Sequence, residues 1–358
     1  MRQDLGLVSF FVILIARIKG GYCSMKFGII TDAHLFHRYA IKPEKYKEII
    51  QDLNNNSEIE FIVDCGDLTD KSILTAPQVE ILTHIFDYVT KPVYIVAGNH
   101  DSLEGTTVAT ALELNPNVKV IKEPTIINDL LFVPYVNTAK ELYGKLNSLV
   151  SGNNIPKYAF SHINVTSNIY SMIPFRDVDK LFKYAKYWYN GHIHTEEERL
   201  TAFGRFINIG ACSSLTFGDN HIPCYTIVDV DSNETVNVEN HGIDGSIIHK
   251  VFSTENLNKV YDEINYATRF YKMRCRFKLP NNESSLEMRK QICQRFEDNS
   301  NVLSLNFDYI KTEVKKQKQE IKVDKEKLKL NLYEQLFQRF EEDTQLSISK
   351  EIKEELMS

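Results

Sequence analysis

Carboxylate, imidazole and amide side chains follow five short apolar runs of the sequence, each where the run ends. The five groups are Asp32-Ala33-His34, Gly66-Asp67, Gly98-Asn99-His100-Asp101, His162 and Gly191-His192-Ile193-His194. Such oxygen and nitrogen ligands suit hard to borderline divalent cations. A lone histidine or aspartate is more often a surface, core or turn residue, but five groups in this order indicate one shared site.

Seven of these side chains are enough for two cations, namely Asp32, His34, Asp67, Asn99, His162, His192 and His194. A carboxylate can bridge two cations about 3.5–4 Å apart, the separation that clamps both reacting oxygens of a phosphoryl transfer. Asp67 stands alone on its loop and is therefore the predicted bridge. The glycines before Asp67, Asn99 and His192 are expected to let the strand turn abruptly and the backbone approach the substrate.

Apolar β-rich runs alternate with helical patterns from Met25 onward, which predicts an α/β domain with largely buried strands. Ligands of open α/β sheets bind at the carboxyl ends of strands, so segments far apart in the chain can converge there. Strands are expected at 26–31, 60–65, 92–97, 131–136, 157–161, 184–189, 205–209 and 224–230, with helices at 43–53 and 77–89.

A change of composition after about Asp231 separates a main domain at 25–235 from a small α+β cap domain at 240–310. The cap is expected to have strands near 269–278 and 302–309 around a helix near 284–295. Residues 311–329 are rich in lysine and are predicted to form a solvated linker or exposed helix. Helices are expected at 330–358, packed on their own domain or bound to a partner protein. Their apolar stripe is Leu332, Tyr333, Leu336, Phe337 and Phe340.

Residues 1–24 form an apolar N-terminal extension whose run from Leu5 to Ala16 is shorter than the about 20 residues of a transmembrane helix. We interpret it as an over-called start, with a signal or anchor peptide as the alternative, and expect no stable membrane association. The six cysteines show no C-x-x-C spacing, so free thiols in a reducing cytoplasm are expected. The net charge of -6 means that DNA affinity would need local basic patches or bound metal.

The ordered set D-x-H, G-D, G-N-H-D, H and G-H-x-H resembles the calcineurin-like metallophosphoesterase superfamily. Three further segments, Asn115–Pro124, Leu131–Tyr135 and Ile209–Gly218, resemble its SbcD-type recombination-nuclease branch, which includes endonuclease subunits of T-even-like phages. The resemblance implies a metallophosphoesterase-type sandwich of mixed sheets flanked by helices. It also implies a DNA exonuclease or endonuclease that serves recombination, repair or replication.

The same resemblance implies roles for single residues. Both cations would be Mn²⁺. One would be held by Asp32, His34, Asp67 and His194, and the other by Asp67, Asn99, His162 and His192. His100 would contact the scissile phosphate and assist the leaving group, and Asp101 would orient it or only cap the next turn. Many nuclease relatives have a histidine where this chain has Asp70. Asp70 would either orient His100 or merely solvate the loop.

The implied partners are DNA and an SbcC-type SMC-like ATPase bound to the C-terminal helices, and a homodimer is a further candidate. The implied location is the cytoplasm, that of the host cell if the protein is phage-encoded. The alternative function is a metallophosphatase that acts on phosphoproteins or small phosphoesters in a narrower pocket. A non-catalytic scaffold is disfavoured by the complete ligand set. The sequence has no G-x-x-x-x-G-K-[ST] loop, so it offers no ATP-hydrolysing site of that kind.

Overall fold

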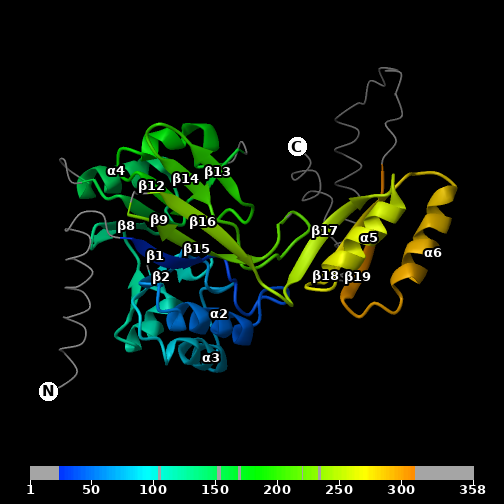
Figure 1. Ribbon diagram of the computed structural model, residues 1–358, viewed down its shortest axis with the longest axis horizontal. Coiled ribbons are helices and arrows are strands. Elements are labelled where there is room, and N and C mark those ends of the chain that lie inside the picture. Colours follow the sequence, from blue (N-terminus) through cyan, green and yellow to red (C-terminus); the bar gives the residue numbers. More distant parts are fainter. Residues whose placement is uncertain are drawn as a thin grey trace, which may run out of the picture. The chain divides into compact units, whose positions relative to one another are not determined.

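The computed structural model describes residues 24–103, 106–150, 155–167, 171–219, 221–232 and 235–310. In this part of the chain two six-stranded mixed sheets pack face to face, with helices on their outer faces (Figure 1). The predicted α/β sandwich is confirmed. The N-terminal extension up to residue 23, the lysine-rich linker and the C-terminal helices lie outside the described residues. Among the described helices, none has the length and apolar character needed to cross a membrane.

The first sheet has the strand order β16-β15-β1-β2-β3-β6. Four of its strands run parallel, and β15 and β16 extend it by antiparallel pairing beside β1. Their bounds are Met25–Ile30 (β1), Phe61–Asp64 (β2), Val93–Val96 (β3), Val118–Ile121 (β6), Cys224–Val230 (β15) and Val236–Gly242 (β16). Strand β16 therefore lies beyond the predicted end of the main domain at residue 235.

The second sheet has the order β13-β14-β12-β9-β8-β7, with four parallel inner strands and an antiparallel strand at each edge. The bounds are Thr125–Ile127 (β7), Leu130–Val133 (β8), Tyr158–Ser161 (β9), Tyr187–Asn190 (β12), Glu197–Leu200 (β13) and Arg205–Asn208 (β14). Short pairs elsewhere are Ser102–Leu103 (β4) with Thr106–Thr107 (β5), and Val165–Thr166 (β10) with Ile173–Pro174 (β11).

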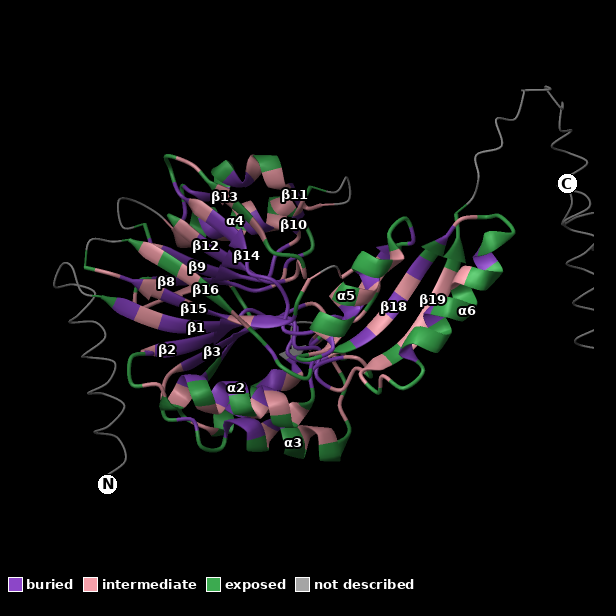
Figure 2. Ribbon diagram, turned by 45° about the vertical axis from the view of Figure 1, so that its right-hand side comes forward, coloured by how far each residue is buried: buried purple, intermediate pink, exposed green. Residues whose placement is uncertain are grey.

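Aromatic side chains fill the space between the two sheets. Phe27 and Phe61 of the first sheet stack with their ring centroids 5.0 Å apart, and Phe160 of the second sheet meets both edge-on. All three are completely buried. Buried ring pairs add to the hydrophobic stabilisation of a core, so this layer fixes the two sheets relative to each other. Figure 2 shows inner strands of the sheets, such as β1, β2 and β3, mostly in the colour of buried residues.

Helices cover the two outer faces of the sandwich because each has one apolar stripe. In α2 the side chains of Tyr46, Ile49, Ile50 and Leu53 are buried at helical spacing against the first sheet. The helices on that face are Pro43–Asn55 (α2), Ala76–Phe86 (α3) and the 3₁₀ helix Val108–Leu114 (η1), and those on the other are Ala139–Leu149 (α4) and Phe175–Leu181 (η2).

The segment after β16 forms a three-stranded, all-parallel sheet with two helices and its own apolar core. Its elements are Ile247–Ser253 (β17), Leu257–Ala267 (α5), Lys272–Leu279 (β18), Ser284–Phe296 (α6) and Val302–Tyr309 (β19). The sequence pattern indicates the last three of these elements but not β17 or α5. We call residues 247–309 the small sheet unit below.

The five cysteines in the described ranges are free, as expected; four are buried, and Cys293 is exposed.

A buried carboxyl group at the end of β2 matters more for stability than these thiols do. Asp64, at the end of β2, accepts hydrogen bonds from the Tyr46 hydroxyl (2.6 Å) and the Gly66 N–H (2.9 Å). Burial raises the pKa of Asp64 from 3.8 to about 7, although these hydrogen bonds lower it.

The raised pKa of Asp64 predicts a pH-dependent stability. Between about pH 4 and pH 7 the folded protein keeps a proton that the unfolded chain has lost, so stability falls as the pH rises. We expect Asp64→Asn, which cannot ionise, to gain free energy of unfolding relative to the unmodified protein across this window, by at most about 1.4 kcal/mol per pH unit. Denaturant unfolding with a chelator present measures the difference. A difference independent of pH would contradict the raised pKa.

Candidate metal centre

The predicted ligands come from loops at the carboxyl ends of strands in both sheets. Asp32 and His34 follow β1, Asp67 follows β2 and Asn99 follows β3, all in the first sheet. In the second sheet His162 directly follows β9, and His192 and His194 follow β12. Backbone hydrogen bonds tie neighbouring loops together, among them those from His34 N to the Asp67 carbonyl and from Asp32 N to the Gly66 carbonyl (both 2.9 Å).

Three clusters of described residues have ligand atoms within 4.8 Å of one another, and one of them, His34, Asp70 and His100, shares His34 with the first cluster described here. Asp32, His34 and His194 form this first cluster. Nε2 of His34 lies 3.3 Å from Nε2 of His194 and 3.8 Å from Oδ1 of Asp32. Nε2 of His194 lies 3.6 Å from the same Asp32 oxygen. Two imidazole nitrogens and one carboxylate oxygen therefore converge on one point.

Asp67, His162 and His192 form the second cluster, and Asn99 joins it. The amide oxygen of Asn99 lies 3.2 Å from Nε2 of His162 and 2.9 Å from Nδ1 of His192. Oδ2 of Asp67 lies 3.2 Å from Nε2 of His162 and 3.9 Å from Nε2 of His34. One oxygen of Asp67 thus faces both clusters, which is the placement that a bridging carboxylate requires.

The donor atoms of the first cluster suit a cation. Oδ2 of Asp32 accepts hydrogen bonds from the Thr31 hydroxyl (2.6 Å) and the His192 backbone N–H (3.0 Å). Oδ1 is buried and has no hydrogen-bond partner among the described residues. A buried carboxylate oxygen without a partner is costly unless a positive charge meets it. Its position between the imidazole rings of His34 and His194 matches the coordination preferences of a divalent transition metal.

The electrostatics of the centre keep two of its four histidines neutral, while the pKa of each of the other two, His162 and His194, is raised. Burial lowers the pKa of His34 and of His192 to about 3, so both rings are neutral. Burial also lowers the pKa of His162, but the carboxylates of Asp67 and Asp32 outweigh it and raise that pKa to about 10. Burial would raise the pKa of Asp67, yet His162 and its other neighbours hold it well below the usual range. A cation bound there must replace the proton on His162.

Four of the seven predicted ligands have left-handed backbone conformations. The φ angles are 52° at Asp32, 45° at His34, 53° at Asp67 and 70° at His192. Only a few per cent of non-glycine residues have positive φ, and each costs of the order of 1–3 kcal/mol. The hydrogen bonds between the loops maintain these strained conformations. The conformations in turn direct the side chains toward one centre.

Glycine is required where two of these loops touch. A Cβ atom on Gly98 would lie 2.1 Å from Oδ1 and 2.3 Å from the backbone nitrogen of Asp67. A Cβ atom on Gly191 would lie 2.1 Å from Oγ1 of Thr31. The sequence predicted that these glycines let the backbone approach the substrate. In the structure they let one ligand loop lie against the neighbouring loop.

The contact between Gly98 and Asp67 gives a prediction with a matched control. We expect Gly98→Ala to displace the Asp67 carboxylate and weaken cation binding by at least about tenfold, the effect of disturbing a supporting contact of a metal ligand. Gly144→Ala lies in α4, where an added Cβ meets no atom within 4 Å, so it should bind cations normally and unfold at slightly higher temperature. Calorimetric titration with Mn²⁺ measures both. Equal affinities in the two variants would contradict the argument.

His100 lies at the exposed side of the first cluster, with its ring centroid 4.7 Å from that of His34. Its backbone N–H donates to Oδ1 of Asp67 (2.8 Å), and its Nδ1–H donates to the backbone carbonyl of Asp70 (3.1 Å). The carboxylate of Asp70 lies 3.9 Å from Nδ1 of His34 instead. Asp70 therefore orients His100 through its backbone, which any residue type could do, and its side chain faces His34.

Asp101 is fully buried between two ligand loops. Its carboxylate accepts hydrogen bonds from the backbone N–H groups of Leu68 and Gly98, both at 2.9 Å, and from the Ser102 hydroxyl at 3.4 Å. Among the described hydrogen bonds, none joins this carboxylate to the His100 ring. The geometry gives Asp101 the part of a positioning residue, because it ties the loop of Asp67 to the loop of Asn99.

Asp219 supports His194 and was not among the residues predicted from the sequence. Oδ1 of Asp219 lies 3.2 Å from Nδ1 of His194, and its Oδ2 accepts hydrogen bonds from the backbone of Leu215 (2.7 Å) and Thr216 (2.8 Å). A carboxylate on the second ring nitrogen of a ligating histidine fixes its orientation. Asp219 lies in a loop away from any strand end, and the only available signal was its place directly after the segment Ile209–Gly218.

Comparison with known proteins identifies the part of the chain that carries the ligand loops. Residues 25–196 match the family model described as "Calcineurin-like phosphoesterase". No match to the chain was found among curated proteins. A solved structure of an archaeal phosphodiesterase aligns at 17% identity with a TM-score of 0.36, covering 61% of this chain and 100% of that chain. That similarity is too low to carry function from one protein to the other.

Proposed function

We propose that this protein is a two-metal DNA nuclease that hydrolyses phosphodiester bonds, a proposal supported by the match of residues 25–196 to the calcineurin-like phosphoesterase model. The observation that carries the proposal is the shared oxygen of Asp67, which faces the cluster of His34 on one side and that of His162 on the other. Two divalent cations, when bound, lower the pKa of a water and neutralise charge on the phosphate. We propose Mn²⁺ as the ion in both positions.

The proposed ligands are divided between the two cations in the same way as between the two clusters. Asp32, His34 and His194 serve one cation, Asn99, His162 and His192 serve the other, and Asp67 serves both. Asp101 and Asp219 hold the loops and the His194 ring that these cations require.

His100 is the proposed proton donor to the leaving oxygen. Its Nδ1–H is engaged by the carbonyl of Asp70, which leaves Nε2 to give or take a proton at the exposed side of the centre. The ring of His34, 4.7 Å away, holds His100 from the buried side. We therefore expect His100→Asn to retain cation binding and to lose about 10²–10⁴-fold in kcat, the usual share of general acid catalysis.

The choice of DNA over a phosphoprotein or a small phosphoester rests on the resemblance of Asn115–Pro124, Leu131–Tyr135 and Ile209–Gly218 to the SbcD-type branch. A metallophosphatase remains the second candidate because the same centre would serve it equally well. The substrate assay uses the full chain with Mn²⁺ on linear duplex DNA, single-stranded DNA, p-nitrophenyl phosphate and bis(p-nitrophenyl) phosphate. We expect both DNAs and the diester to be cleaved. Intact DNA beside rapid cleavage of the monoester would favour the phosphatase.

We further propose that the protein acts in the cytoplasm, in DNA recombination, repair or replication, with an SbcC-type ATPase as partner. The proposed contact is the stripe in residues 330–358 that contains Leu332, Leu336 and Phe340, which lies outside the described residues. Deletion of residues 332–358 should abolish co-purification with the ATPase and leave diester hydrolysis intact. Undiminished co-purification would refute the contact.

A further inference from the structure

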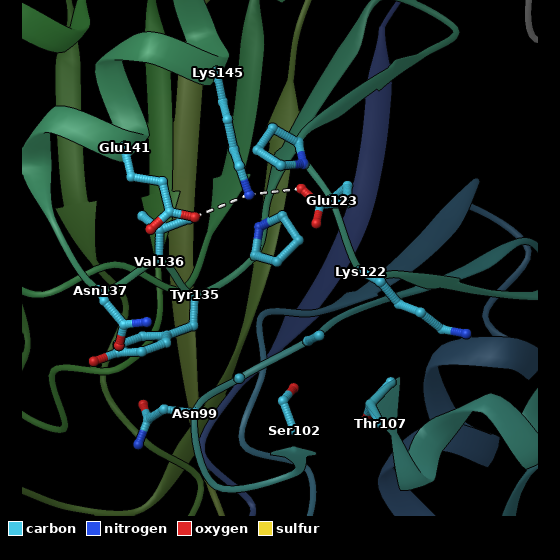
Figure 3. A pocket seen from close by; sticks show the side chains of 14 residues that line it. Asn99, Ser102, Thr107, Lys122, Glu123, Tyr135, Val136, Asn137, Glu141 and Lys145 are labelled. Carbon is cyan, nitrogen blue, oxygen red and sulfur yellow. Dashed lines mark hydrogen bonds and ion pairs between the residues drawn. The ribbon is translucent and has the colours of Figure 1, made fainter. Parts of the chain in front are cut away.

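A cavity of about 370 Å³ lies beside the second cluster, with Gly98 and Asn99 in its wall (Figure 3). Its volume is in the range of pockets that hold small ligands. Asn99 also contacts His162 and His192, so the cavity begins at the candidate metal centre. Whatever occupies it would be attached to, or lie next to, the phosphate at that centre.

Tyr135 supplies an aromatic wall at the end of the cavity nearest the centre. Its ring centroid lies 5.6 Å from that of His192 and 6.4 Å from that of His162. The backbone N–H of Tyr135 donates to the carbonyl of Ala97 (3.0 Å), which fixes the residue beside the loop of Asn99. Figure 3 shows its side chain above Asn99 and next to Asn137. An aromatic face so close to the reacting phosphate suits stacking with a flat ring.

The charges in the cavity wall cancel. Lys145 lies between Glu123 (2.7 Å) and Glu141 (3.0 Å), as the dashed lines in Figure 3 mark. Lys122 is the second lysine in the wall, so the wall contains two lysines and two glutamates. A second phosphate would gain no net attraction there. An uncharged group with donors and acceptors would find hydrogen-bonding partners, because the rest of the wall includes Ser102, Thr107 and Asn137.

We propose that this cavity binds the nucleoside next to the scissile phosphate of an unpaired DNA strand, with its base stacked on Tyr135. The inference rests on the proposed function, since it assumes a phosphodiester at the metal centre. A base held in a cavity cannot remain paired in a duplex, so the proposal favours single strands and frayed ends as substrates. Specificity for an attached nucleoside would separate this protein from a phosphatase that needs only the phosphate.

The test compares two chromogenic diesters with the same leaving group, with the full chain and Mn²⁺. One is thymidine 5′- or 3′-(p-nitrophenyl phosphate), and the other is methyl p-nitrophenyl phosphate, which lacks the nucleoside. We expect Tyr135→Ala to lower the ratio of kcat/KM for the nucleoside ester over the methyl ester by about 5- to 150-fold, the value of one base stacked on an aromatic ring. Tyr135→Phe should keep the ratio.

Tyr88→Ala is the control, because this side chain is 74% exposed and does not line the cavity. An unchanged ratio in Tyr135→Ala, or an equal loss on both esters, would overturn the subsite. If Tyr135→Ala does not fold, Tyr135→Leu, which keeps the apolar volume without the ring, takes its place. Calorimetric binding of thymidine monophosphate tests the subsite independently of turnover, and weaker binding by the alanine variant is the expected result. An unmodified protein that hydrolyses neither ester nor DNA would refute the proposed function instead.

Discussion

Replacement of Asp67 by asparagine is expected to reduce kcat/KM on DNA by at least about 10³-fold, equivalent to about 4 kcal/mol of transition-state stabilisation. The variant keeps the shape of the side chain but removes the charge of the oxygen that faces both clusters. Asparagine tolerates the left-handed backbone found at this position, where φ is 53°. Its fold should therefore survive.

The measurement for Asp67→Asn is steady-state hydrolysis together with thermal unfolding. Asp87→Asn is the matched control, because Asp87 lies at the exposed end of α3 and loses the same charge far from the ligand loops. We expect the control to retain full activity. Activity within a few-fold of normal in Asp67→Asn, with the fold intact, would remove the basis of the two-metal proposal.

Removal of the cations is expected to abolish hydrolysis completely, and added Mn²⁺ should restore it. The structure also predicts how the number of bound ions changes with single substitutions. His194 contributes only to the first cluster and His192 only to the second. We expect two ions per chain in the unmodified protein and one in each of His194→Ala and His192→Ala, because each variant keeps the other cluster whole.

Metal analysis by mass spectrometry after removal of excess Mn²⁺ gives the number of ions directly. Both single variants should lose at least about 10²-fold in activity even at saturating Mn²⁺, since one cation cannot stabilise both reacting oxygens. A single ion in the unmodified protein, or two ions in both variants, would contradict the assignment of ligands to clusters.

The position of the centre could be predicted because its residues occupy strand ends. The strands before Asp32, Asp67 and Asn99 are short apolar runs, and a parallel sheet brings their carboxyl ends to one edge. Convergence of polar groups there follows from the topology and needs no knowledge of side-chain packing. The sandwich of two sheets, by contrast, was implied only by the resemblance to the metallophosphoesterase superfamily, and the structure confirms it.

Other parts could not be predicted because they depend on contacts between distant segments. Asp219 lies in a loop, and only the folded chain shows its carboxylate next to His194. The helix α5, Leu257–Ala267, is a different case: its apolar residues recur at helical spacing, a signal that the prediction did not use, and Val260 and Ile264 are buried in the core of the small sheet unit. The role of Asp101 was equally hidden, since its partners are backbone groups of other loops.

The left-handed backbone at Asp32, His34, Asp67 and His192 has a consequence for attempts to engineer the protein. Glycine takes that conformation without steric penalty, so a glycine at any of these positions would relieve strain while it deletes a proposed ligand. Selection for thermostability alone would therefore enrich glycines at these four positions and give variants that are more stable but inactive. A library designed to raise the thermostability of this chain should keep these four codons constant.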